Sequence, residues 1–107
     1  MNTFDDRKKG FEAKFLKDQE VQFKIRAKRN KFIGFWAAEI IKPENYDEYV
    51  KEVRLSDLEK PGDDDIIDKL LADFEKNSAN ISREEIIKKI DECEQKAKDE
   101  YIKEIEI

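Results

Sequence analysis

Residues 21–40, VQFKIRAKRNKFIGFWAAEI, decide the fold of this chain. Apolar side chains recur there at spacings of four, seven, four and four residues, which places them on one face of an α-helix. That face consists of Val21, Ile25, Phe32, Trp36 and Ile40. We therefore predict an amphipathic helix that buries this face against the rest of the molecule.

The predicted helix extends in both directions from this stretch. No proline occurs before Pro43, so we expect helix from about residue 4 to 42, as one segment or as two abutting segments. Thr3 is a plausible N-cap. Gly10 and Gly34 lie inside the segment, and each costs about 1 kcal/mol relative to alanine. Gly10 lies where tertiary contacts are expected to be fewest, so we expect residues 1–18 to fray when the protein is unbound. At Gly34 we expect close helix packing.

The N-terminal end carries a stripe of three phenylalanines. Phe4, Phe11 and Phe15 are spaced by seven and four residues, so on a helix they share one narrow face surrounded by charged side chains. Such a stripe fits insertion into a groove of a partner protein. It could equally fold back on the edge of the molecule, and periodicity alone leaves both interpretations open.

Three more helices are predicted after Pro43. Asn45 with Glu48 predicts a capped helix over about 45–59, and a Pro61-Gly62 break precedes a helix over about 63–77. The expected apolar positions of these two helices are Tyr46, Tyr49, Val50 and Val53, and then Ile66, Ile67, Leu70, Leu71 and Phe74.

The start of the last helix has the clearest local pattern. Ser82 and Glu85 form a capping box, and Ile81 and Ile86 stand where a hydrophobic staple would place them. An apolar face then continues through Ile86, Ile90, Cys93, Ala97 and Tyr101. The fold class is therefore all-α, most simply a four-helix bundle whose long first helix overhangs the rest. At 107 residues we expect a single domain over 1–107.

The charges are distributed unevenly along the chain. The net charge is −5, and residues 1–20 are balanced. Residues 22–31 hold five Lys or Arg and no acid, a segment that we call the basic collar, whereas residues 32–107 carry a net charge of −10. The collar could be solvated or paired with the acidic body, or it could dock on an acidic protein. Binding of nucleic acid is disfavoured, because an acidic domain repels a polyanion at long range.

Residues for catalysis or for metal binding are scarce. Without histidine there is no imidazole base, and the phosphate-binding patterns GxxxxGK[ST] and GxGxxG are absent. A single cysteine and no histidine make a zinc site unlikely on chemical grounds. An EF-hand loop starting at Asp63 would need Gly at 68 and Glu at 74, where Asp68 and Phe74 stand. We expect no enzyme, no metal and no cofactor, and Cys93 is expected to be a small buried residue rather than a redox sensor.

The N-terminal third resembles a known family. The ordered series Thr3-Phe4-Asp5-Asp6-Arg7, Phe11-Glu12, Lys14-Phe15, Asp18-Gln19-Glu20, Phe23-Lys24, Ala27, Arg29-Asn30, Gly34 and Trp36-Ala37-Ala38-Glu39 closely resembles the zeta subunit family of small bacterial inhibitors of the F-type ATP synthase. The chain departs from that pattern at Lys28, where arginine is more frequent, and at Phe35, where a smaller aliphatic residue is usual.

The resemblance implies a function and a set of contact residues. It implies that residues 1–18 form a mobile inhibitory segment and residues 19–107 a four-helix body. The segment would enter a catalytic interface of the synthase head and stop rotation in the hydrolytic direction. Its contact residues would be Phe4, Asp5, Asp6, Arg7, Phe11, Glu12 and Phe15, with a secondary contact through Lys24, Lys28 and Arg29 of the basic collar.

Two further expectations complete this interpretation. The protein would be a monomer when free, cytoplasmic, and peripheral to the inner membrane through the synthase; no run of eighteen apolar residues predicts insertion into the membrane. The alternative is a helical ligand-binding bundle, for a nucleotide, or a protein adaptor that acts through its body. Inhibition needs the first 18 residues, whereas a function of the body should survive their removal.

Overall fold

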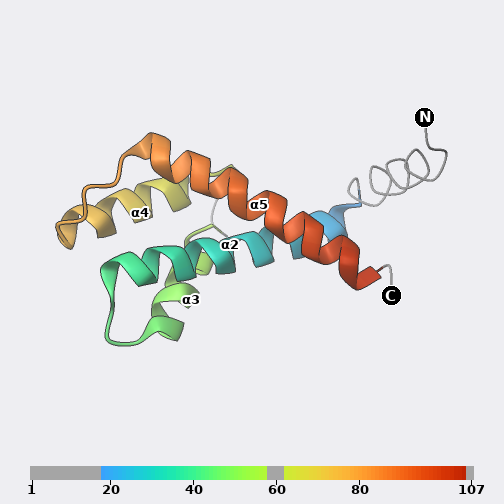
Figure 1. Cartoon of the computed structure of the whole chain (residues 1–107), viewed down its shortest axis with the longest axis horizontal. Helices are drawn as coiled ribbons and strands as arrows, with labels where there is room; N and C mark the ends of the chain where they lie inside the picture. Colours follow the sequence, from blue (N-terminus) through green and yellow to red (C-terminus); the bar gives the residue numbers. More distant parts are fainter. Residues whose placement is uncertain (1–17, 58–61, 106–107) are drawn as a thin grey trace.

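The computed structural model describes residues 18–57 and 62–105. These residues form four α-helices and no strand, so the predicted all-α class is confirmed (Figure 1). The helices are α2 (Gln19–Ile41), α3 (Tyr46–Ser56), α4 (Asp64–Lys76) and α5 (Arg83–Ile105). The predicted N-cap at Thr3, Gly10 and the phenylalanine stripe lie outside the described residues.

Helix α2 begins with its own cap at Asp18. This residue has extended backbone angles, φ −69° and ψ 130°, and its carboxylate accepts hydrogen bonds from the N–H groups of Glu20 (2.8 Å) and Val21 (3.4 Å). An extended residue cannot continue a helix, so α2 starts as a segment of its own. Of the two predicted alternatives, one uninterrupted helix over residues 4–42 is therefore excluded at Asp18. At the other end Lys42 adopts a left-handed conformation before Pro43, which ends the helix.

The other predicted caps are confirmed. The side-chain oxygens of Asn45 and Ser82 accept hydrogen bonds from the N–H groups three residues later, each at 3.1 Å. Helix α3 ends at Ser56, three residues before the predicted end, with Asp57 as its C-cap. The earlier end has a tertiary cause, because the Asp57 side chain is bound to α2.

Helices α2 and α5 lie side by side and antiparallel, and they are the two longest helices of the described residues (Figure 1). Helix α3 packs on α2, and α4 packs against α5 and α3. With 23 residues each, α2 and α5 are about 35 Å long, roughly twice the length of α3 and α4. Their excess length forms a two-helix neck, made of residues 19–25 and 97–105, in which Val21, Ile25, Ala97 and Tyr101 pack together.

The main core joins all four helices. Most predicted apolar positions are buried in this core or elsewhere in the molecule, but Tyr46 is 39% exposed. Phe32, Trp36 and Ile40 are only half-buried, whereas the neighbouring small or aliphatic positions of α2 are fully buried. The large rings pack at the edge of the core, where Trp36 meets Phe74 edge-on at 5.4 Å. The buried members of this core are Ile33, Ala37, Ala38, Tyr49, Val53, Ile66, Ile67, Leu70, Phe74, Ile86, Ile90 and Cys93.

Gly34 sets the distance between α2 and α3. A Cβ atom at this position would lie 3.0 Å from Cγ1 and 3.1 Å from Cα of Val50. The predicted close helix packing at Gly34 is therefore confirmed, and it lets the middle of α3, at Val50, approach α2 closely.

Candidate functional site

The structure separates the members of the basic collar. Lys24 is exposed and lies 3.5 Å from Glu20 on the same helix. Lys28 reaches across to α5, where its ammonium group lies 2.8 Å from Glu104 and 3.1 Å from Glu100. The hydrogen bond to Glu104 raises the pKa of Lys28 above its ordinary value, with burial opposing and Glu100 adding to the effect.

Arg29, the third collar residue expected at a partner interface, is turned into the molecule. It is only 1% exposed, and its guanidinium lies 3.0 Å from Asp63 and 3.6 Å from Asp57. For Lys28 and Arg29 the structure thus agrees with the interpretation that the collar pairs with the acidic body. Arg29 offers no surface to a partner in this conformation.

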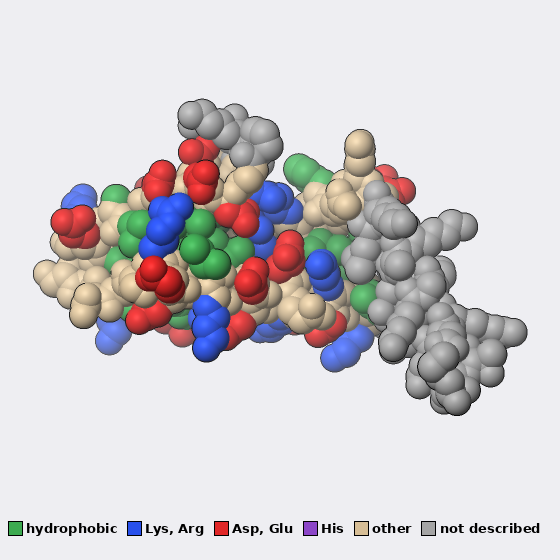
Figure 2. Space-filling model, turned by 90° about the horizontal axis from the view of Figure 1, so that it is seen from above, with side chains coloured by type: hydrophobic (Ala, Val, Ile, Leu, Met, Phe, Trp, Pro, Cys, Tyr) green, Lys and Arg blue, Asp and Glu red, His purple; other side chains and the backbone are tan. Residues whose placement is uncertain are grey.

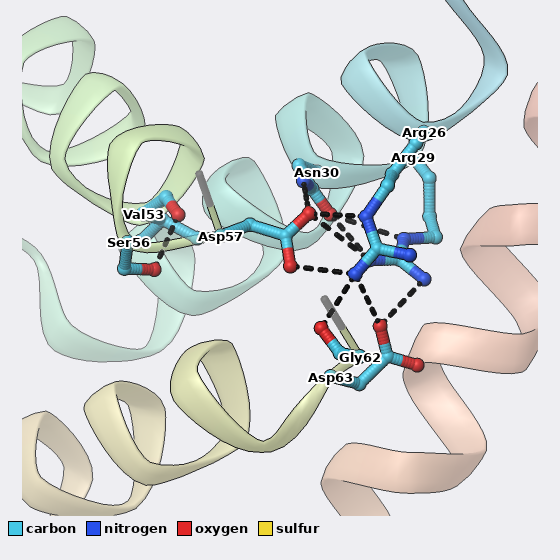
Figure 3. Close-up of polar contacts among 8 residues, drawn as sticks. All are labelled: Arg26, Arg29, Asn30, Val53, Ser56, Asp57, Gly62 and Asp63. Atoms are coloured by element: carbon cyan, nitrogen blue, oxygen red, sulfur yellow. Dashed lines mark hydrogen bonds and ion pairs between the residues drawn. The ribbon is translucent and has the colours of Figure 1, made fainter. Parts of the chain in front are cut away.

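Arg29 belongs to a polar hub that joins three helices (Figure 3). Asp57, at the end of α3, accepts hydrogen bonds from Arg26 and from the Asn30 amide, the latter at 2.7 Å. Asn30 in turn accepts two hydrogen bonds from Arg29, at 2.9 and 3.0 Å. Arg26 also donates to the carbonyl oxygen of Gly62 (2.6 Å) and to Asp63 (2.9 Å) at the start of α4. The hub consists of Arg26, Arg29, Asn30, Asp57 and Asp63.

The electrostatics of the hub favour the ionised form of Asp57. Burial alone would raise the pKa of this carboxyl, but hydrogen bonds from Arg26 and Asn30 and the charges of Arg26 and Arg29 outweigh burial and lower the pKa. The role of the hub is therefore structural: it fixes Asp57, at the end of α3, and Gly62 and Asp63, at the start of α4, on α2.

A large groove lies beside the hub, between α2 and α3. Its volume is about 910 Å³. Asp57 of the hub and Gly62, whose carbonyl oxygen accepts from Arg26, are among its lining residues. Three of its side chains are large, apolar and exposed to water: Phe23 (66%), Leu55 (50%) and Phe35 (36%). We call this feature the apolar groove. Its remaining lining residues are Arg26, Ala27, Asn30, Lys31, Asp47, Val50, Lys51 and Arg54.

The sequence pattern indicated neither the hub nor the groove. Both depend on how closely α2 and α3 approach, and no local spacing reports this distance. The only local signal for the hub was the presence of acids, Asp57 and Asp63, on either side of the Pro61-Gly62 break.

The remaining candidate residues are accounted for by packing and by ion pairs. Cys93 is buried in the core, as predicted, and burial raises the pKa of its thiol. Asp63 is bound in the hub, and Asp64 lies 3.3 Å from Arg83. Within residues 18–57 and 62–105, no three potential ligands of a metal ion are grouped together.

The described residues on the face seen in Figure 2 show no segregation into a basic and an acidic end. On the face seen in Figure 2, acidic and basic side chains are interspersed, with small apolar patches among them. None of the described helices combines the length and the apolar character that crossing a bilayer requires.

The described part of the chain thus consists of four helices packed on an apolar core, with ion pairs between them and an apolar groove on the surface. The chain belongs to the ATPase inhibitor subunit zeta family, whose family model matches residues 1–100. No curated protein matches the sequence significantly. The family description is that of an inhibitor subunit, a regulatory role, and the predicted resemblance is confirmed.

Proposed function

We propose that this chain inhibits ATP hydrolysis by the F-type ATP synthase, and that residues 1–18 act by entering a catalytic interface of the synthase head. The observation that carries the proposal is the family match, which begins at residue 1 and so includes the phenylalanine stripe as well as all but the end of α5.

The construction of the body supports this division of the chain. Among the described residues, the main core and the apolar cluster of the neck are both made of side chains from Val21 onward. Asp18 caps α2 by itself, so this helix can begin without a preceding helical turn. The body therefore has its own core and its own N-terminal cap, and the segment before Asp18 can serve a partner.

The inhibitory segment would bind through apolar and charged contacts together. Burial of each ring of Phe4, Phe11 and Phe15 is worth about 1.5–3 kcal/mol before the cost of ordering the segment. The charged residues Asp5, Asp6, Arg7 and Glu12 would set the register and exclude wrong partners. A helix wedged between head subunits opposes closure of the catalytic site and turning of the central shaft.

The basic collar would make a weaker, secondary contact. Lys24 is exposed, and Lys28 could exchange Glu100 and Glu104 for acids of the head. Arg29 is committed to the hub, so it would support this surface by holding α2 in place rather than by touching the partner.

Removal of residues 1–17 tests the proposal. The truncation retains Asp18, because loss of this cap would itself destabilise α2 by about 1 kcal/mol. The expected result is a body that unfolds at nearly the same temperature as the full chain but no longer inhibits ATP hydrolysis by the cognate synthase head. A truncated protein that inhibits as strongly as the full chain would place the function in the body.

Single substitutions refine the same test. Phe11→Ala and Phe15→Ala should each weaken binding to the head by about 2 kcal/mol or more, as is usual for aromatic anchors in a filled pocket. Ile87→Ala is the matched control, because Ile87 is an exposed apolar residue of α5, and it should leave inhibition unchanged. If Phe11→Ala lowers the melting temperature and inhibition follows only the folded fraction, the stripe packs on the body and the insertion mechanism fails.

A further inference from the structure

The exposed apolar surface of the described residues is concentrated in one place. Five large hydrophobic side chains are exposed, and Phe23, Phe35 and Leu55 among them line the apolar groove. Phe23 and Phe35 are twelve residues apart on α2, which corresponds to about 18 Å along the helix axis. Three exposed hydrophobic side chains that line one groove indicate an interaction site, whereas single scattered ones do not.

The charges at the rim of the groove narrow the choice of partner. Lys31, Lys51 and Arg54 line it, and none of them has an acidic partner within the described part of the chain. The lining acids are Asp57, which is paired with Arg26 in the hub, and Asp47, so cations still outnumber acids there. Elsewhere the described cations are frequently paired, as Lys28 is with Glu104 and Arg83 with Asp64. The groove is therefore locally basic although the chain carries a net charge of −5.

Three occupants can be compared by charge. Residues 1–17 hold five basic and three acidic side chains, so this segment and the rim carry the same sign of charge. A second copy that docked groove to groove would set the same cations, Lys31, Lys51 and Arg54, against one another. An acidic amphipathic helix matches both properties of the groove, since it offers an apolar stripe to the floor and carboxylates to the rim.

We propose that the apolar groove binds an acidic amphipathic helix of another protein, about three turns long. Its apolar face would pack on Phe23, Phe35 and Leu55, and its carboxylates would pair with Lys31, Lys51 and Arg54. The two walls, α2 and α3, would then form a three-helix contact with the guest helix. This inference goes beyond inhibition by residues 1–18, and the two can hold or fail separately.

A photo-crosslinker inside the groove tests the inference. The full chain carries benzoylphenylalanine in place of Phe35 and is irradiated in its native cells, and the crosslinked peptide is identified by mass spectrometry. The expected adduct is a peptide of a different protein with net negative charge and apolar residues at helical spacing. The same probe in place of Ile87, an exposed residue of α5 outside the groove, should not give this adduct.

Charge reversal gives the decisive comparison. The variant K31E/K51E/R54E should lower the yield of the Phe35 adduct by about tenfold or more, because like charges at an interface oppose association. The control variant K76E/K88E/K103E makes the same change in net charge at exposed positions outside the groove and should leave the yield unchanged. Thermal unfolding of both variants establishes that each is folded.

Several results would overturn the inference. Three concern the crosslinked peptide, which could come from residues 1–17 of the same chain, from a second copy, or from a basic partner protein. The other two concern the yield of the position-35 adduct, which could be unaffected by K31E/K51E/R54E or no higher than that of the probe at position 87. Inhibition of ATP hydrolysis is measured in parallel with K31E/K51E/R54E. Retained inhibition with a lost adduct separates this surface from the inhibitory segment.

Discussion

Asp57 is the residue that attaches the end of α3 to α2. Its carboxylate receives the donors of Arg26 and Asn30 from α2, and it is only 7% exposed. A buried carboxylate without these donors would be costly, and two buried or half-buried guanidinium groups without an anion would be costly as well. The hub therefore stabilises the fold as a unit, and removal of one member leaves the others unpaired.

Asp57→Asn is expected to destabilise the protein by about 3–5 kcal/mol at pH 7, because it removes the anion from a buried ion-pair network. The pKa of Asp57 lies below its ordinary value of 3.8, so its contribution is complete above that value and is lost as the pH falls through the folded-state pKa. The difference between the wild type and Asp57→Asn should shrink when urea unfolding is measured near pH 3.

Asp91→Asn, at an exposed position of α5, is the control and should change the unfolding free energy by no more than about 0.5 kcal/mol at either pH. An equal gap between wild type and Asp57→Asn at pH 7 and pH 3 would show that Asp57 stabilises the fold through shape rather than charge.

At the scale of the helices, the local chemistry of caps and breaks predicted the bounds of α3 and α4, the start of α5 and the end of α2 within a few residues, but not the start of α2 at Asp18. Asn45 and Ser82 cap as expected because an N-cap needs only the three residues that follow it. The face of α2 was predicted less well, since Phe32 and Trp36 share the apolar spacing but lie at the edge of the core. Which apolar residue fills the centre depends on the distance between helices, and Gly34 sets this distance.

Gly34→Ala tests that control of distance. Alanine favours a helix over glycine by about 1 kcal/mol, so an unpacked site would be stabilised. Here the new methyl group would meet the backbone of Val50 at 3.1 Å, and backbone cannot move aside as a flexible side chain can. Overpacking of this kind costs about 1–3 kcal/mol, so we expect net destabilisation by thermal or urea unfolding. An increase in stability would mean that α3 shifts freely on α2.

At the scale of the whole molecule, the neck consists of only two helices, α2 and α5. Val21 and Ile25 pack on Ala97 and Tyr101, whereas the main core draws on all four helices. The elements and their amphipathic faces could be predicted from sequence, but the neck, the hub and the apolar groove could not. Each of these depends on contacts between residues far apart in the chain, such as Lys28 with Glu104, and no local spacing encodes such a pair.

Hydrogen exchange should reveal this division. Amides of residues 21–25 and 98–104 should exchange faster than those of residues 33–38 and 86–93, because opening the neck exposes less apolar surface than opening the main core. The measurement is native-state exchange read by mass spectrometry or NMR. Equal protection along the whole length of α2 and α5 would show that the molecule opens only as one unit.

The pairing of α2 with α5 also determines when the protein can finish folding during its synthesis. Lys28 and its partner Glu104 are 76 residues apart in the chain. A ribosome adds about 5–20 residues per second, so roughly 4–15 s pass between the synthesis of Lys28 and that of Glu104. During that interval the apolar positions Val21 and Ile25 have no covering helix. The nascent chain thus holds α2 half-covered until α5 has been made, so these two helices pair only after α3 and α4 have been translated.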